Sequence, residues 1–399
     1  MPKTRRSSGR AGVSPVLLRL LGAGVVATLV AVSVVQQTMA EFLAGRAPVQ
    51  ALSWAPWHAV ANGNRAVELL GSPEPSLRQA SARFAMHAFA RNPALATPVA
   101  AIGLQTADRR GNDAARPLLL AAERLSRREP AAQIWLINDA VARDDVGGAL
   151  NHFDNALRTS NANAAVLLPV LAGAAADPRL LPAIRKLVAS QPPWRWQFFD
   201  ELANRGSDGR TAFAVTDGLY DPRSAAGARF ATQLTQRLVQ EGEVDLARRL
   251  YARRPGGLPP AALVRHPRFD SEPDGSPFDW TFIQADNLRA NIEPGPDGGL
   301  ALAISGAGGE AGIAARQVLR LPPGRYRVSL EGAAVEAAST LTATLSCLGA
   351  PAKTASAELT VTETCRAQDL FVLVSFDPSA TSQVAYLRGV RLERVAGNG

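Results

Sequence analysis

Hydrophobic residues follow three different patterns along this chain of 399 residues. An almost continuous apolar run occupies residues 16–35, and Ala- and Leu-rich stretches with short polar, Pro or Gly junctions fill residues 60–256. From residue 300 onward apolar and polar positions alternate. These patterns are typical of a membrane-spanning helix, of helix–turn–helix units and of β-strands, in that order. The chain is therefore predicted to be multidomain, with one N-terminal transmembrane helix, a helical region and a C-terminal β-domain.

The alternating runs predict an antiparallel β-sandwich over residues 278–396, because seven or so short strands separated by turn residues need two packed sheets. The runs cover residues 300–304, 318–321, 326–330, 341–345, 359–361, 371–376 and 384–395. The helical pattern stops at the Pro- and Gly-rich stretch from Arg254 to Pro260. Residues 257–277 are predicted to be a linker, and the Gly-rich stretch 306–311 is predicted to be a hairpin loop.

Residues 16–40 are predicted to be a transmembrane helix or signal anchor. The basic residues Lys3, Arg5, Arg6, Arg10 and Arg19 precede the first acid, Glu41. The positive-inside rule then makes residues 1–15 a cytoplasmic tail and places the bulk of a single-pass inner-membrane protein in the periplasm. The alternative is a cleaved signal peptide with a site at Thr38-Met39-Ala40. Trp54 and Trp57 follow the span and either anchor it at the interface or pack on the first helices.

The net charge of +8 does not indicate a nucleic-acid partner. Five of these positive charges lie in the first 19 residues, so the remaining chain carries a net charge of only +3. Aromatic residues make up 6% of the chain and are not interleaved with basic ones, as base stacking would require. No nucleic-acid binding is predicted.

A spacing of 34 residues recurs in the helical region. Small, larger and small residues stand at relative positions 0, 4 and 7, which share one helix face. The three columns are Ser81, Ala115, Ala149 and Ala183; Ala85, Leu119, Phe153 and Leu187; and Ala88, Ala122, Ala156 and Ser190. With Pro93 after the first unit and Gly103 at a small position, residues 41–256 resemble a tetratricopeptide-repeat (TPR) array. That resemblance implies an α-solenoid that binds protein partners; the alternative is an Ala-rich helical bundle.

Two further features qualify the repeat. A later unit fits at Ala247 and Tyr251 but is four residues out of phase, so residues 192–220 are predicted to be irregular. An aromatic cluster in this segment, Trp194, Trp196, Phe198 and Phe199, either anchors a protein partner or forms a packed seam between repeats.

Three short motifs mark the β-domain: Phe278-Asp279-Trp280, the turn and strand from Leu321 to Tyr326, and the closing strand from Tyr386 to Glu393. In this order they resemble jelly-roll domains of the carbohydrate-binding-module or galactose-binding-like kind. The resemblance implies glycan binding on exposed aromatic rings, for which Trp280, Tyr326 and Tyr386 are the candidates. The alternative is that all three belong to the core.

Cys347 and Cys365, the two cysteines, lie 18 residues apart near the ends of alternating runs. In an oxidising compartment this pair predicts a disulfide between neighbouring strands. A redox dithiol, the alternative, would favour CxxC spacing on a helix.

The sequence contains no catalytic motif, and its four His lie in separate segments, so no catalytic residue, metal or cofactor is predicted. Asp270, Glu272 and Asp274 have the spacing of a calcium loop, but Thr281 stands where the bidentate Glu belongs, so an acidic linker is favoured.

The functional hypothesis is an envelope scaffold that binds protein through the helical region and glycan through the sandwich, in polysaccharide assembly or export. A glycan-binding module with a helical spacer and a carbohydrate-active enzyme with scattered carboxylates are the alternatives.

Overall fold

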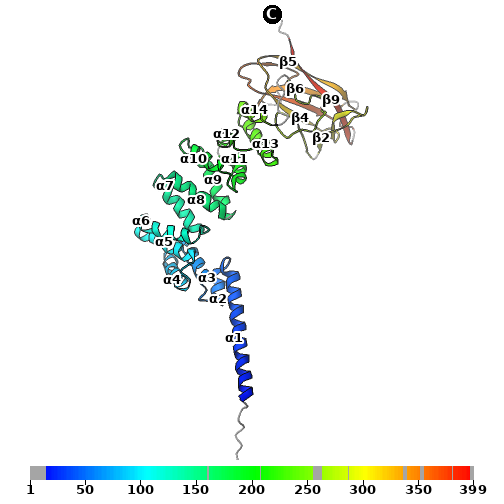
Figure 1. The fold of residues 1–399 in the computed structure, drawn as a ribbon. Coiled ribbons are helices and arrows are strands. Elements are labelled where there is room, and N and C mark those ends of the chain that lie inside the picture. The colour runs from blue at the N-terminus through cyan, green and yellow to red at the C-terminus, as the bar shows by residue number, and fades with distance from the viewer. Residues whose placement is uncertain are drawn as a thin grey trace, which may run out of the picture. The chain divides into compact units, whose positions relative to one another are not determined.

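The computed structural model describes residues 15–159, 161–206, 208–254, 263–285, 287–335, 339–350, 355–379 and 381–395. Within them a region of 14 helices precedes two antiparallel β-sheets (Figure 1). The helices are α1 (Pro15–Ala44), α2 (Pro48–Trp54), α3 (Ala59–Leu70), α4 (Pro75–Arg91), α5 (Ala96–Arg110), α6 (Asn112–Leu125), α7 (Pro130–Ala142), α8 (Val146–Thr159), α9 (Asn161–Ala174), α10 (Leu181–Ala189), α11 (Arg195–Asn204), α12 (Gly209–Thr216), α13 (Ala225–Gln240) and α14 (Val244–Ala252). Residues 1–14 of the predicted cytoplasmic tail and residues 257–262 of the predicted linker lie outside the described residues.

By internal contacts the chain divides into two compact units, Met1–Leu167 and Leu168–Gly399. Each unit has its own packed helices, and the second also contains both sheets. The segment boundaries predicted from the sequence, at residues 15, 40, 256 and 277, stay predictions.

Helix α1 is the one helix of the described chain that is long and apolar enough to cross a membrane. Its residues Ala23–Ala44 have a mean hydropathy of 1.6, and only 6% of the apolar window is buried by the rest of the protein. Since this exposed apolar surface needs lipid rather than water around it, the helix suits a single span or a signal sequence.

In the first unit neighbouring helices pack in pairs, α3 with α4, α5 with α6 and α7 with α8. The residues of the 34-residue columns are buried in α4, α6 and α8. The small residue Gly103 of α5 faces one of these columns, and a Cβ at this position would lie only 2.7 Å from Cγ of Leu119 in α6. Close approach of two helices therefore depends on small residues where the sequence places them.

The spacing fails in the fourth unit. In α10 the buried residues are Ile184 and Val188, one position after the predicted Ala183 and Leu187, and Ser190 is exposed. The prediction that residues 192–220 are irregular is wrong, because α11 and α12 occupy most of this segment. Their apolar residues, such as Phe198 and Phe199, are buried and so draw the segment into the helical packing.

The predicted sandwich is confirmed as two antiparallel sheets, one ordered β1-β4-β8-β6 and the other β2-β3-β9-β5-β7. The strands are β1 (Thr281–Phe282), β2 (Leu288–Pro294), β3 (Leu300–Gly306), β4 (Ala311–Leu319), β5 (Gly324–Ala334), β6 (Thr340–Cys347), β7 (Glu358–Val361), β8 (Gln368–Ser375) and β9 (Gln383–Val395). The alternating apolar residues of both sheets form one core, including Leu302, Leu345, Val372 and Leu387.

Strand order differs from one expectation. The stretch 306–311 is not a hairpin loop, because β3 pairs with β2 and β9 whereas β4 pairs with β1 and β8. It crosses from one sheet to the other, as connections in a sandwich commonly do.

Candidate functional site

A cavity of about 470 Å³ lies between helix α13 and the four-stranded sheet, inside the second compact unit. This volume is within the usual range for small-molecule pockets. The described lining residues come from α13 (Gln236, Val239 and Gln240), from the segment entering the sandwich (Pro277 and Thr281), from β4 (Arg316 and Val318) and from the end of β6 (Leu348 and Gly349). The cavity therefore combines the helical region with the sandwich.

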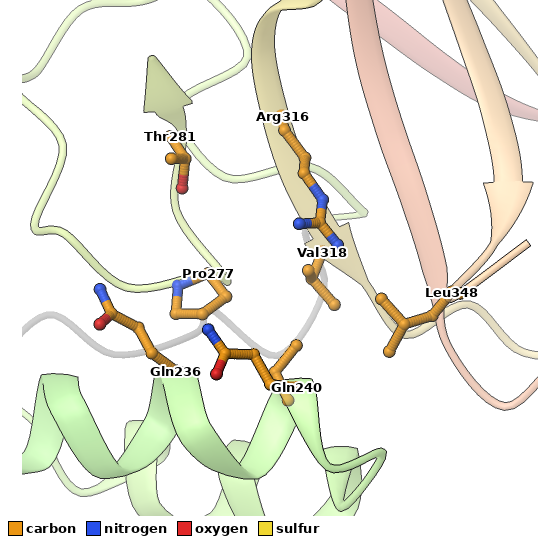
Figure 2. Close-up of a pocket in the computed structure, with 9 residues that line it drawn as sticks. Gln236, Gln240, Pro277, Thr281, Arg316, Val318 and Leu348 are labelled. Atoms are coloured by element: carbon orange, nitrogen blue, oxygen red, sulfur yellow. The ribbon is translucent and has the colours of Figure 1, made fainter. Parts of the chain in front are cut away.

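Helix α13 presents two amides to this space. The Ser224 hydroxyl accepts a hydrogen bond from the Gly227 N–H at 3.1 Å and so begins the helix. Gly242, with φ +80°, follows the helix and lets the chain turn away. Gln236 and Gln240 are four residues apart and so share one face, and Figure 2 shows both side chains rising from the helix toward the strands.

Arg316 enters from the opposite side. Strand β4 shifts register between Ile313 and Ala315, after which Thr281, Arg316 and Phe371 pair across three strands. Because side chains alternate along a strand, Arg316 and Val318 face α13 while Ala315 lies in the core. Figure 2 shows Arg316 and Thr281 projecting toward the helix.

A buried carboxylate holds the Arg316 guanidinium in place. Nε and Nη2 of Arg316 lie 2.8 and 2.7 Å from Oδ1 of Asp369, whose side chain is only 5% exposed. The guanidinium carbon also lies 6.0 Å from the Phe371 ring centre. Charge-assisted bonds of this kind fix orientation, and two of the five N–H donors are engaged in them. The pair has no net charge, so the site offers donors and acceptors without a strong preference for an ion.

Contacts of α13 and α14 with the sandwich and with the segment before β1 hold the helical wall of the cavity. The buried Tyr251 hydroxyl donates to Oδ2 of Asp274 at 2.8 Å, and burial raises the pKa of Tyr251, so the phenol stays protonated. Arg320 Nε lies 3.2 Å from Oδ1 of Asp245. Nε2 of Gln236 donates to the Gly275 carbonyl at 2.9 Å. The bonds to Asp274 and Gly275 fasten α14 and α13 to the segment that leads into β1, and the Arg320–Asp245 pair joins α14 to the sandwich itself.

The predicted glycan-binding rings are not brought together on a surface. Trp280 and Tyr326 are each 1% exposed and belong to the sandwich core, where the Trp280 indole N–H donates to the His266 carbonyl and the Tyr326 hydroxyl to that of Pro322. Their ring faces are covered, so a sugar has no access to them. This matches the alternative of core residues for both. Tyr386 on β9 is half-buried.

The aromatic cluster of α11 is a packed seam. Trp194, Phe198 and Phe199 are no more than 2% exposed, and only Trp196 is partly exposed. The Phe199 ring centre lies 5.0 Å from that of Phe230 in α13. Aromatic pairs at this distance contribute to packing, so the cluster supports α13 rather than presenting three anchors to a partner.

Cys347 and Cys365 form a disulfide, as predicted, with Cα atoms 5.4 Å apart. The bridge ends strand β6 immediately before Leu348 and Gly349, which line the cavity. It hints at an oxidising compartment.

Within the described residues no group of three or more His, Cys, Asp or Glu side chains could hold a metal ion. Asp274 is instead a hydrogen-bond acceptor for Tyr251 and for the Ser276 N–H.

The sequence reasoning missed Gln236, Gln240, Thr281 and Arg316. Alternation along β4 could have placed Arg316 on the outer face of the sheet, but no local pattern in α13 indicates that this helix faces the sheet.

No protein-family model matches the chain, and a comparison with curated proteins finds no match either.

Proposed function

We propose that this chain is a membrane-anchored periplasmic scaffold or adaptor in envelope or extracellular polysaccharide assembly and export. Its helical region, a TPR-like solenoid, binds protein partners, and its jelly-roll-like sandwich binds glycan. The observation that carries the glycan part is the cavity between α13 and β4, with its amides, hydroxyl and neutralised guanidinium.

The chemistry of the cavity fits a neutral sugar. Gln240 supplies two donors and an acceptor, and Gln236, one of whose N–H groups is engaged with the Gly275 carbonyl, supplies one donor and an acceptor. Thr281 supplies a hydroxyl, and Arg316 supplies further N–H donors. Pro277, Val318 and Leu348 add apolar surface for the C–H face of a pyranose ring. A polyhydroxylated ligand needs this mixture, since every buried hydroxyl must find a partner.

Two observations support the other parts of the proposal. Ile134 and Val141, seven residues apart on α7, are 42% and 63% exposed on either side of the exposed Asn138, and this mixed face suits a protein partner. Helix α1 supplies the anchor. The alternative of a glycan-binding module with a passive helical spacer is disfavoured because α13 itself contributes Gln236 and Gln240 to the cavity.

The test is affinity electrophoresis of the detergent-solubilised full chain against polysaccharides of the producing cell. Gln240→Ala and Thr281→Val should each raise the dissociation constant about 2- to 12-fold, the equivalent of one hydrogen bond of about 0.5–1.5 kcal/mol. Gln197→Ala, an exposed glutamine on α11 away from the cavity, is the matched control and should leave retardation unchanged.

Each result separates the hypotheses. Retardation that survives Gln240→Ala but is lost in Thr281→Val would favour the spacer alternative. Absence of retardation on every polysaccharide would overturn the glycan part. Release of reducing ends during the assay would favour the enzyme alternative, although the described lining residues include no Asp or Glu.

A further inference from the structure

If α1 spans a membrane, as proposed above, the charged residues at its two ends define how deep each residue of the helix lies in the bilayer. Arg19 and Glu41 enclose 21 uncharged residues, 20–40. At 1.5 Å per residue these extend about 30 Å, the thickness of the hydrocarbon core. Glu41 then lies at the boundary of the leaflet next to the body of the chain.

Helix α1 passes from this boundary into the first compact unit without a break. Ala40 and Ala44 are 0% and 2% exposed, so the end of the helix is part of the core. The Ala44 carbonyl accepts a hydrogen bond from Nδ2 of Asn64 at 2.8 Å. The body of the unit is therefore held at a fixed height relative to the span.

One contact sets the height of the turn between α2 and α3. Nδ1 of His58 accepts the Ala61 N–H at 3.2 Å, which leaves the proton on Nε2. Nε2 in turn lies 2.8 Å from Oε2 of Glu41. His58 is only 4% exposed, so this turn is fixed at the level of Glu41.

Trp57, the residue before His58, lies below that level. Its side chain lines a groove of about 560 Å³ along α1 together with Val26, Leu29, Val30, Ser33, Val34 and Gln37. Gln37 and Ser33 precede Glu41 by four and eight residues, or about 6 and 12 Å of helix. Trp57 is 45% exposed, so its side chain is open to the medium around α1.

We propose that the α2–α3 turn is a second membrane contact, in which Trp57 enters the leaflet beside α1 and the groove holds a phospholipid acyl chain. The occupant follows from depth and chemistry: apart from Ser33 and Gln37 the groove walls are apolar side chains of a span, and lipid is the solvent at that depth. An indole suits this position because its N–H can reach the ester region while its ring stays in hydrocarbon.

The test is quenching of tryptophan fluorescence in the full chain reconstituted into phosphatidylcholine vesicles. One set of vesicles carries bromine near the top of the acyl chain and another carries it near the methyl end. The chain has six Trp, so Trp57→Phe should lower the emission and remove a large part of the quenching by the shallow bromine, with the remainder coming from Trp54, which is 44% exposed. The control Trp135→Phe, at a half-buried residue of the helical core, should retain that quenching.

Circular dichroism verifies that each variant keeps its helix content. Equal shallow quenching in the wild type and Trp57→Phe would overturn the proposal. An intact mass showing that residues 1–40 have been removed from the membrane-purified protein would also overturn it, because no span would then remain beside Trp57.

Discussion

The hydrogen bond between Tyr251 and Asp274 offers a direct test of how the last helices are held against the sandwich. Tyr251 is 0% exposed in α14, and its hydroxyl donates to Oδ2 of Asp274 at 2.8 Å. Tyr251→Phe removes this bond and leaves the ring, which packs 5.5 Å from Phe278 between ring centres. The change therefore isolates the hydroxyl.

The size of the effect follows from the surroundings of the carboxylate. A hydrogen bond to a charged group contributes about 1.5–3 kcal/mol. Asp274 is 26% exposed on its side chain and has Arg254 and Arg265 at 3.9 and 4.0 Å, so part of the loss is offset. We expect the helix to lose about 1–2 kcal/mol of local stability, which is a 5- to 30-fold increase in its open population.

Hydrogen exchange measured by mass spectrometry on the full chain reads this population directly. Amides of α14 should exchange 5 to 30 times faster in Tyr251→Phe, while amides of α6 in the other compact unit should not change. Tyr220→Phe is the matched control, since burial raises the pKa of Tyr220 to about 12 but its hydroxyl has no hydrogen bond to another described residue. Unchanged α14 protection in Tyr251→Phe, or equal acceleration in both variants, would refute the assignment.

Three further predictions concern other parts of the chain. Replacing Cys347 and Cys365 with Ser should lower the free energy of unfolding by about 3 kcal/mol, because the bridge closes a loop of 18 residues; a urea midpoint unchanged from the oxidised protein would contradict this. Gly103→Ala should cost about 1–3 kcal/mol, seen as a lower melting temperature, because its Cβ would lie 2.7 Å from Cγ of Leu119. Burial raises the pKa of Glu129 in the folded chain above the unfolded value of about 4.3, so its contribution to stability is complete below that pH and is lost as pH rises through the folded pKa. Glu129→Gln should therefore raise the melting temperature at pH 7, with a gain that disappears toward about pH 4, and a gain that grows on acidification would be inconsistent with this cause.

Local sequence pattern predicted most of the secondary structure. Apolar residues without charge over 20–40 gave the span-length helix, and alternation located seven of the nine strands of the described chain. The missed strands are β1, which has only two residues, and β2, although its Leu288, Ala290 and Ile292 do alternate with polar residues. The disulfide was predictable because both cysteines lie near the ends of alternating runs, although only Cys347 lies in a strand. These features depend on neighbours within a few residues, which a sequence displays directly.

The 34-residue spacing predicted which residues are buried only in those helices that turn the same face toward their neighbours. Ala115, Leu119 and Ala122 are all buried as expected. In α10 the burial moves by one residue to Ile184 and Val188, because the orientation of a helix is set by what it packs against. A repeat in the sequence cannot report such a rotation.

The tertiary structure alone decided the candidate site. Trp280 and Tyr326 looked like sugar-stacking rings in the sequence, but two sheets close over them because large apolar rings are most stable in the core. Gln240 and Arg316 are 76 positions apart in the sequence and carry no shared motif. They face one cavity because α13 is fastened to the segment that leads into the sandwich, and such long-range pairing depends on the packing of the folded chain rather than on any local pattern.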